Sequence, residues 1–256
     1  MLVVLLLVGV FVTSVLSGIA GMAGGVVLLA LLILTLPTYS AMVLHGLIQA
    51  MANGSRVSFK RDHVQWHLIP SYFIGVLVTG VIFWWAQISW SAPVILIAIG
   101  LFSWLPVLIP NSFGLDITRK PVAMICGIAT TVATLLAGTS GPLLDVFFQT
   151  SKLTRFEIVA TKAFTQTISH LVKIAYFLWL TISLSKPLHE LVGLLYVIAF
   201  LLTSLIGTKI GTMLLKRINE TNFQRMSRIL IMILGTAVGI SGIMQLQSGQ
   251  AWIAFT

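Results

Sequence analysis

The sequence predicts an all-α polytopic membrane protein made of two inverted-topology repeats, each with one broken, re-entrant helical hairpin and three transmembrane helices. Three observations lead to this fold class. The chain of 256 residues is 58% hydrophobic and only 8% charged. One pattern of polar residues occurs twice, at an offset of 117 positions (residue 162 against residue 45). The basic residues gather in short segments between long apolar runs.

The composition places the chain in a bilayer. A water-soluble domain carries roughly 25% charged residues, far more than this chain has. Several runs supply the ~20 apolar residues that a helix needs to cross a membrane. These runs are continuous rather than alternating, which excludes a β-barrel. The net charge of +9 lies in short loops, as membrane orientation requires. The expected partner is therefore the lipid bilayer, and nucleic acid is not expected.

Eight apolar runs follow one another along the chain. The loops after the second, fourth, fifth and seventh runs are basic, whereas the loops after the first and third runs and the C-terminal tail carry no Lys or Arg. The positive-inside rule places the basic loops in the cytoplasm. The runs cover about 2–36, 41–59, 68–86, 91–110, 120–150, 157–183, 189–215 and 226–246.

The fifth run is expected to turn back inside the membrane. Arg119 and Lys120 precede it and Lys152 and Arg155 follow it, so both of its flanks belong to the cytoplasm. A simple span cannot begin and end on one side. The segment Gly138–Pro142 supplies a suitable break, because glycine and proline interrupt helices.

The first run is expected to turn back in the same way. The glycines of the second break align with Gly21 and Gly24 at the repeat offset, and both flanks of the run 2–36 are uncharged. The halves 1–115 and 116–256 then start on opposite sides, with both chain termini on the non-cytoplasmic side. The alternative, eight plain spans in a parallel repeat, would put one of the two basic loops flanking the fifth run outside the cytoplasm.

The repeated polar pattern lies on helices that ought to be apolar. Steps of four, four and three residues put each set on one helix face. Polar and cationic side chains at membrane depth mark substrate or ion pathways. The first set is His45, Gln49, Asn53 and Arg56, and the second is Lys162, Gln166, His170 and Lys173.

The two breaks and the two polar sets together predict a site for an anion. A short helix begins after each break, and a helix start offers free N–H groups and the positive end of the dipole. Two such ends that meet near the midplane would bind a negatively charged substrate. The polar sets add cations and further donors. The substrate-binding candidates are both polar sets with Gly21, Ala23, Gly24, Gly25, Gly138, Thr139, Ser140 and Gly141.

Asp145 is the exceptional acid within these segments and a candidate for coupling transport to an ion. It is expected either to form a salt bridge with Lys162 or Lys173 or to carry a proton; the alternative is that it stabilises the start of its helix. No metal site is expected, because neither His45 nor His170 has a second histidine or a carboxylate four residues further on.

The chain resembles the TauE/SafE sulfite-exporter family of membrane permeases over essentially its whole length. The likeness rests on the breaks Gly21–Gly25 and Gly138–Pro142, on His45–Gln49 with Asn53 and Arg56, and on Ala160–Ala163 with Gln166, His170 and Lys173. It implies a multi-pass carrier in the bacterial inner membrane that moves sulfite, sulfonates or related sulfur oxyanions and uses no cofactor.

Two other functions compete with a secondary transporter. One is an anion channel of the same fold. The other is an intramembrane serine protease, since Gly138–Gly141 matches the GxSG motif of rhomboid proteases and His170 lies on another helix. Ser140 aligns with Ala23 in the repeat, so the break recurs without the nucleophile, and an enzyme is not expected. The sequence leaves open whether a homo-oligomer forms.

Overall fold

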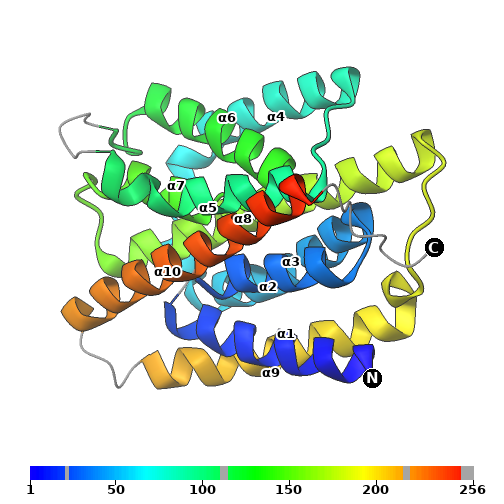
Figure 1. The fold of residues 1–256 in the computed structure, drawn as a ribbon. Coiled ribbons are helices and arrows are strands. Elements are labelled where there is room, and N and C mark those ends of the chain that lie inside the picture. Colours follow the sequence, from blue (N-terminus) through cyan, green and yellow to red (C-terminus); the bar gives the residue numbers. More distant parts are fainter. Residues whose placement is uncertain (21–22, 110–114, 216–219, 249–256) are drawn as a thin grey trace.

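The computed structural model describes residues 1–20, 23–109, 115–215 and 220–248. Within these ranges all regular secondary structure is helical, which confirms the all-α part of the predicted fold class (Figure 1). The first half contains α1 (Leu2–Ala20), α2 (Ala23–Thr35), α3 (Thr38–Lys60), α4 (Ile69–Ala86) and α5 (Ala92–Leu108). The second contains α6 (Lys120–Ala137), α7 (Gly141–Phe148), α8 (Arg155–Ser183), α9 (Leu194–Leu215) and α10 (Glu220–Gln247). The described residues also form three short 3-10 turns, η1 (Arg61–His63), η2 (Trp66–Leu68) and η4 (Glu190–Val192).

Four described helices are long and apolar enough to cross a bilayer. Large apolar side chains of α4 and α9 are exposed on the outer faces of these helices, where only hydrocarbon would cover them. Two of the long helices outside this group, α3 and α8, carry the repeated polar sets. The four candidate spans are Leu2–Ile19, Trp66–Ala86, Lys120–Ala137 and Leu194–Leu214.

The first apolar run is broken where the glycines predict it. α1 ends at Ala20 and α2 begins at Ala23; Gly21 and Met22 lie outside the described residues. The two helices run antiparallel, because a Cβ added at Gly9 would overlap Leu31, and one added at Gly24 would overlap the Thr13 carbonyl. The run therefore turns back on itself.

The fifth run is also broken at the predicted residues. Gly138 ends α6 with φ of 72°, a left-handed conformation that glycine adopts without steric cost. Pro142 lies in the first turn of α7, where its missing N–H leaves no hydrogen bond unmade. The Ile117 amide, just before α6, donates to the Phe147 carbonyl at 3.1 Å. The two ends of the run thus meet, and α7 leads back toward the beginning of α6.

The helices pack in pairs that correspond between the two halves. α1 packs against α9, and the equivalent helices α6 and α4 pack against each other. The repeat makes α2 equivalent to α7, α3 to α8, α4 to α9 and α5 to α10. The contact of α2 with α10 accordingly matches the contact of α7 with α5, and the contact of α3 with α9 matches that of α8 with α4. α3 crosses α8 in the middle, and α5 packs against α10 (Figure 1). Exchanging the halves reproduces this packing, as a two-fold relation between them would require.

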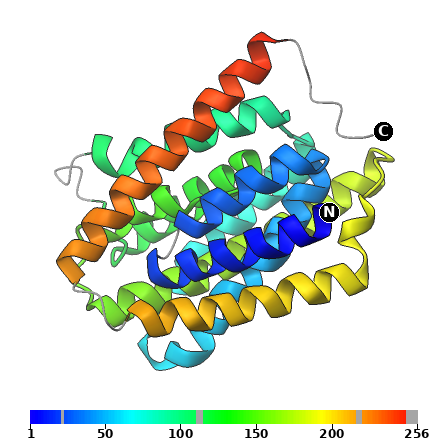
Figure 2. The ribbon, with the colours of Figure 1, turned by 60° about the horizontal axis from the view of Figure 1, so that its bottom comes forward.

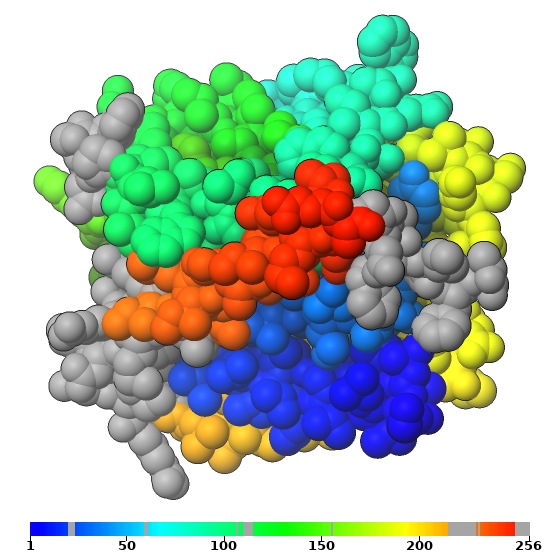
Figure 3. All heavy atoms as spheres, in the orientation of Figure 1, coloured from blue at the N-terminus to red at the C-terminus, as the bar shows by residue number. Residues whose placement is uncertain are grey.

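α10 covers one face of the bundle. It crosses that face diagonally and lies over α5 (Figures 2 and 3). Close approach is possible because Gly100 on α5 faces Gly239 on α10, and a Cβ added at Gly100 would lie 2.8 Å from the Gly239 Cα. Small residues at such contacts let membrane helices pack tightly.

Several helices begin away from the starts of the predicted apolar runs: α3 begins at Thr38 rather than 41, α9 at Leu194 rather than 189, and α10 at Glu220 rather than 226. α8 begins at Arg155, two residues before the expected apolar run, because Thr154 and Glu157 form a capping box. The Thr154 hydroxyl accepts from the Glu157 amide at 3.4 Å, and the Glu157 carboxylate accepts from the Thr154 amide at 2.7 Å. These contacts satisfy amide groups at a helix start that otherwise have no partner.

Candidate functional site

The two polar sets meet where α3 crosses α8. The helices run antiparallel there, with Gly46 packed against Ile174 and the aliphatic stem of Lys173, and Gly54 lying beside Thr167. Six of the eight side chains are buried and face the protein interior rather than the lipid. They are His45, Gln49, Asn53, Gln166, His170 and Lys173.

His45 and Lys173 join the two broken segments through hydrogen bonds. His45 Nε2 lies 2.9 Å from the Gly25 carbonyl oxygen, near the start of α2. His45 Nδ1 lies 2.6 Å from Lys173 Nζ, which in turn donates to the Gly138 carbonyl at 2.9 Å. Both side chains have 0% exposure. A chain of three hydrogen bonds therefore runs from the first half of the protein to the second.

Arg56 connects α3 to the end of α1. Its guanidinium donates to the Ser17 hydroxyl at 2.8 Å and to the Asn53 side-chain oxygen at 3.3 Å. Arg56 is partly buried, and Asn53 is 2% exposed. The cation thus contacts neutral acceptors beside the first break, and the described residues include no carboxylate paired with it.

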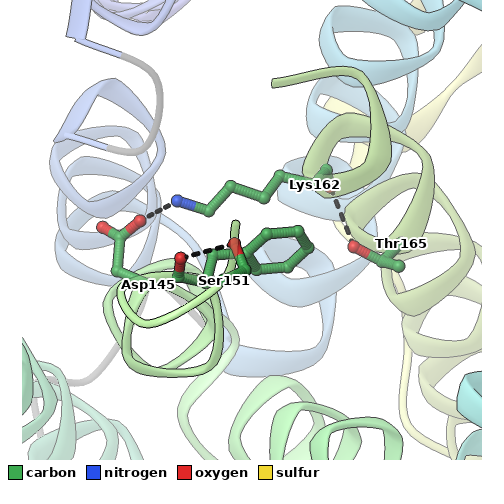
Figure 4. Close-up of polar contacts among 5 residues, drawn as sticks. Asp145, Ser151, Lys162 and Thr165 are labelled. Carbon is green, nitrogen blue, oxygen red and sulfur yellow. Dashed lines mark hydrogen bonds and ion pairs between the residues drawn. The ribbon is translucent and has the colours of Figure 1, made fainter. Parts of the chain in front are cut away.

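Lys162 reaches from α8 to α7 and forms an ion pair with Asp145 (Figure 4). The Lys162 ammonium also lies 5.5 Å from the centre of the Phe148 ring, within the range of a cation–π contact. The side chains of Lys162 and Asp145 remain 19% and 28% exposed. Asp145 is the fifth residue of α7, beyond the first turn, and its carboxylate compensates the positive charge of Lys162.

Three buried polar groups face the crossing without a protein partner. Nδ1 of His170 is inaccessible and makes no hydrogen bond, although its ring lies edge-on to the His45 ring at 5.4 Å. Gln49 and Gln166 are 5% and 9% exposed, and the described structure gives their side-chain amides no hydrogen bond. The Gln49 amide oxygen would lie 3.2 Å from a Cβ built on Gly25. Gln49 on α3 thus lies beside the first break, and its repeat equivalent Gln166 lies on α8.

The residues of the second break are also buried. Thr139 and Ser140 are 6% and 4% exposed, and Ser140 precedes α7 without a side-chain capping bond. A Cβ on Gly138 would meet Leu29 and Met42 at 2.7 Å, so this turn packs against α2 and α3. Among the described contacts, no hydrogen bond joins Ser140 to His170.

The glycines of the first break have different surroundings. Gly24 faces Thr13 and Ser17 of α1, so its missing side chain serves the packing of the hairpin. Gly25 instead borders Gln49 and accepts the hydrogen bond from His45. Ala23 begins α2. Gly21 lies outside the described residues.

Tyr72 is a buried polar residue that the sequence reasoning missed. Its hydroxyl lies 2.8 Å from the Ser169 hydroxyl and 3.1 Å from the Thr130 hydroxyl, and it donates to the Thr165 carbonyl at 3.3 Å. These contacts tie α4 to α6 and α8. The signal was a tyrosine inside an apolar run, since a buried phenol usually finds a polar partner.

The described residues contain no group of three or more His, Cys, Asp or Glu side chains that would hold a metal ion. What the crossing of α3 and α8 offers instead is cationic groups and N–H donors. Such a set suits the oxygens of an anion.

Comparisons of the sequence with curated proteins and of the fold with solved structures gave no match. A family model described as "Sulfite exporter TauE/SafE" matches residues 5–238, which confirms the resemblance seen in the two breaks and the polar sets. The chain therefore belongs to the TauE/SafE family of membrane transporters.

Proposed function

We propose that the protein is a secondary transporter that exports a small sulfur-containing anion, such as sulfite or an organosulfonate, across the bacterial inner membrane by alternating access. The observation that carries this proposal is the charge balance at the crossing of α3 and α8. Lys173 is 0% exposed, Arg56 is partly buried, and neither is paired with a carboxylate in the described part of the chain. A cation inside a membrane protein without a counter-ion favours a negatively charged guest.

The neutral groups around these cations suit an oxyanion. Gln49 and Gln166 occupy equivalent positions in the two halves, and each carries two amide N–H donors that no described group accepts. Unpaired donors on largely buried side chains are costly, and the oxygens of sulfite or of a sulfonate would accept from them. His170 Nδ1 adds a third group of this kind. The substrate then lies between the halves, in contact with both.

Alternating access is supported by the matching helix pairs. The main helix pairs of one half, such as α1 with α9 and α2 with α10, have counterparts in the other half, and the loop charges favour opposite orientations of the two halves. The two broken segments then enter the membrane from opposite sides and turn back within it. In secondary transporters of this plan, the halves rock about a substrate site near the midplane.

The two sides of the site differ although their positions are equivalent. His45 and Lys173 are hydrogen-bonded to each other, and both side chains are fully buried. Their repeat counterparts, Lys162 and Arg56, instead bind separate partners, and Lys162 remains 19% exposed. The loop charges assign Lys162 and Arg56 to the cytoplasmic side. We therefore assign this conformation to the inward-facing part of the cycle, with His45 and Lys173 closing the outer side.

The proposal is tested with the purified full chain in liposomes loaded with unlabelled sulfite. We expect radiolabelled sulfite to enter in exchange and to rise transiently above its equilibrium level, because a carrier exchanges substrate across its site. Methanesulfonate and sulfate in the external buffer test whether other sulfur oxyanions compete. Absence of flux for every sulfur oxyanion tested would contradict the proposal, and an anion conductance without such exchange would indicate a channel.

Variants at the two glutamines locate the site. Gln49→Ala and Gln166→Ala each remove donors that we assign to the substrate, so we expect each to weaken sulfite exchange at least tenfold, which is ~1.4 kcal/mol of lost binding. The matched control is Gln247→Ala, at the exposed end of α10. Unchanged exchange in both test variants would place the substrate elsewhere.

A further inference from the structure

We propose that Thr134 and His170 are positioning residues of the transport cycle, which receive the side chain of Lys173 when it leaves His45 and the site opens to the outside. The inference rests on the proposed function and concerns the same site. In the present conformation Lys173 is instead hydrogen-bonded to His45, across the boundary between the two halves.

Thr134 and His170 each bury a polar atom that has no hydrogen-bond partner. The two side chains are 0% and 5% exposed, and the Thr134 hydroxyl and His170 Nδ1 make no hydrogen bond within the described residues. Thr130, one turn earlier on the same helix, donates its hydroxyl to the Cys126 carbonyl at 2.6 Å, a type of contact that Thr134 lacks. Because buried polar groups nearly always have a partner, both atoms point to a group that reaches them in another state of the protein.

The repeat identifies that group. In the first half, Arg56 donates to the Ser17 hydroxyl at 2.8 Å and to the Asn53 amide oxygen at 3.3 Å. At the repeat offset, Arg56 corresponds to Lys173, Ser17 to Thr134 and Asn53 to His170. The two acceptors of the first cation therefore have, as their equivalents in the second half, the two residues whose buried atoms are unpaired. The equivalent of the cation itself, Lys173, is bonded elsewhere.

Lys173 lies close to both of these residues. His170 precedes it by three positions on α8, which places the two side chains on one helix face. Thr134 lies one helical turn before Gly138 on α6, and Lys173 Nζ already donates to the Gly138 carbonyl at 2.9 Å. All of these residues belong to the second half, so they stay together when the two halves move apart.

The donors and acceptors of the proposed contacts match. The Lys173 nitrogen carries N–H donors whether or not it is charged, and a threonine hydroxyl accepts. A neutral imidazole accepts at Nδ1 when its hydrogen is on Nε2. Because the two tautomers interconvert, His170 Nδ1 can donate to the anion in the present conformation and accept from Lys173 in the other. The exchange of partners therefore requires no change in the charge of Lys173.

Opening of the outer side must break the contact between Lys173 and His45, because the two residues belong to different halves. A buried lysine that lost this acceptor without gaining another would be costly. Thr134 and His170 supply the replacement and so lower the free energy of the outward-facing state. Arg56 shows the corresponding arrangement on the cytoplasmic side, where its bonds to Ser17 and Asn53 lie within its own half. The exchange applies to the outer side alone, since Lys162, the equivalent of His45, offers Arg56 no acceptor.

The test compares Thr134→Val and Thr134→Ser with the wild type in the full chain. Valine keeps the shape of threonine and removes the hydroxyl, which has no bond to lose in the present conformation. We therefore expect Thr134→Val to keep the wild-type Tm in detergent and the rise in Tm that sulfite produces. Its rate of sulfite exchange in liposomes should fall about tenfold, because the outward-facing state loses a hydrogen bond. Thr134→Ser retains a hydroxyl and should restore the rate.

The matched control is Thr131→Val. Thr131 lies on the same helix, is 1% exposed and also has an unpaired hydroxyl. Its repeat equivalent, Ser14, bonds to Ser204 rather than to a cation, so this variant should exchange sulfite at the wild-type rate. His170→Asn introduces the side chain that accepts from Arg56 in the first half, and it should also keep exchange close to the wild-type rate.

Several outcomes would overturn the inference while leaving the proposed function standing. One is a wild-type exchange rate in Thr134→Val, and another is an equal loss of exchange in Thr131→Val. A lower Tm in Thr134→Val that serine does not rescue would show that the hydroxyl serves folding. Loss of exchange in His170→Asn, with stabilisation by sulfite intact, would contradict the role of His170. Absence of exchange in the wild type would instead count against the proposed function itself.

Discussion

The ammonium of Lys162 on α8 is paired with the carboxylate of Asp145 on α7, and this ion pair ties the short limb of the second hairpin to the long central helix. The counterpart of Asp145 in the first half is Leu28, which is fully buried in the core. The pair is thus a feature of one half and breaks the symmetry of the fold.

Removing this ion pair should cost little stability. The two side chains are 19% and 28% exposed, so solvent screens their attraction, and we expect a coupling energy of about 1 kcal/mol or less. The measurement is a double-mutant cycle of Asp145→Asn and Lys162→Gln, read from thermal unfolding in detergent. The coupling should shrink at high salt. A coupling of several kcal/mol that ignores salt would contradict the screened pair described above.

Glycines at the crossing of α4 and α6 should tolerate no side chain. A Cβ added at Gly127 would overlap the Tyr72 carbonyl, whereas one added at Gly80 would meet nothing within 4 Å. We expect Gly127→Ala to destabilise the protein by about 1–3 kcal/mol through overpacking. Gly80→Ala, on the same helix as Tyr72, is the control and should leave Tm unchanged or slightly higher. Equal Tm values for the two variants would show that α4 and α6 pack less closely than described.

The hydroxyl of Tyr72 should contribute measurably to stability. Tyr72 is 1% exposed, and its hydroxyl bonds to Ser169 and Thr130. Tyr72→Phe keeps the ring and removes these bonds, at an expected cost of about 1 kcal/mol. Tyr196→Phe is the control, because Tyr196 is 38% exposed. Thermal unfolding of both variants measures the difference, and equal Tm values would contradict a role for the Tyr72 hydroxyl.

Local features of this fold could be predicted from the sequence, because local chemistry decides them. Continuous apolar runs predicted membrane helices, and Gly138 with Pro142 predicted the break that the structure places between α6 and α7. The steps of four, four and three residues predicted that His45 and Gln49 share a helix face, and both are buried. The sequence also contains the signal for the early start of α8, since Thr154 and Glu157 have the spacing of a capping box.

The pairing of side chains could not be predicted in this way. The contact between His45 and Lys173 joins residues 128 positions apart, and it depends on how α3 crosses α8. Helix periodicity shows which face a side chain occupies, but not which residue of another helix lies opposite it. For the same reason the sequence left Asp145 with two candidate partners, Lys162 and Lys173, and the structure selects Lys162.

The return of the chain within residues 120–150 predicts that both ends of this run are reached from the same side of the membrane. The Ile117 amide bonds to the Phe147 carbonyl, and exposed Lys120 and Lys152 flank the run. In a Cys126→Ala background, cysteines at Lys120 and Lys152 should react with a membrane-impermeant maleimide only in inside-out vesicles.

Lys186 supplies the opposite control for this experiment. It follows α8 and is exposed, and α8 is expected to carry the chain from the cytoplasmic to the outer side. A cysteine at Lys186 should therefore react only in right-side-out vesicles. Labelling of the Lys120 and Lys152 cysteines from opposite sides would mean that 120–150 crosses the bilayer. Such a crossing is incompatible with a re-entrant hairpin, and with it the inverted arrangement of the two halves would fail.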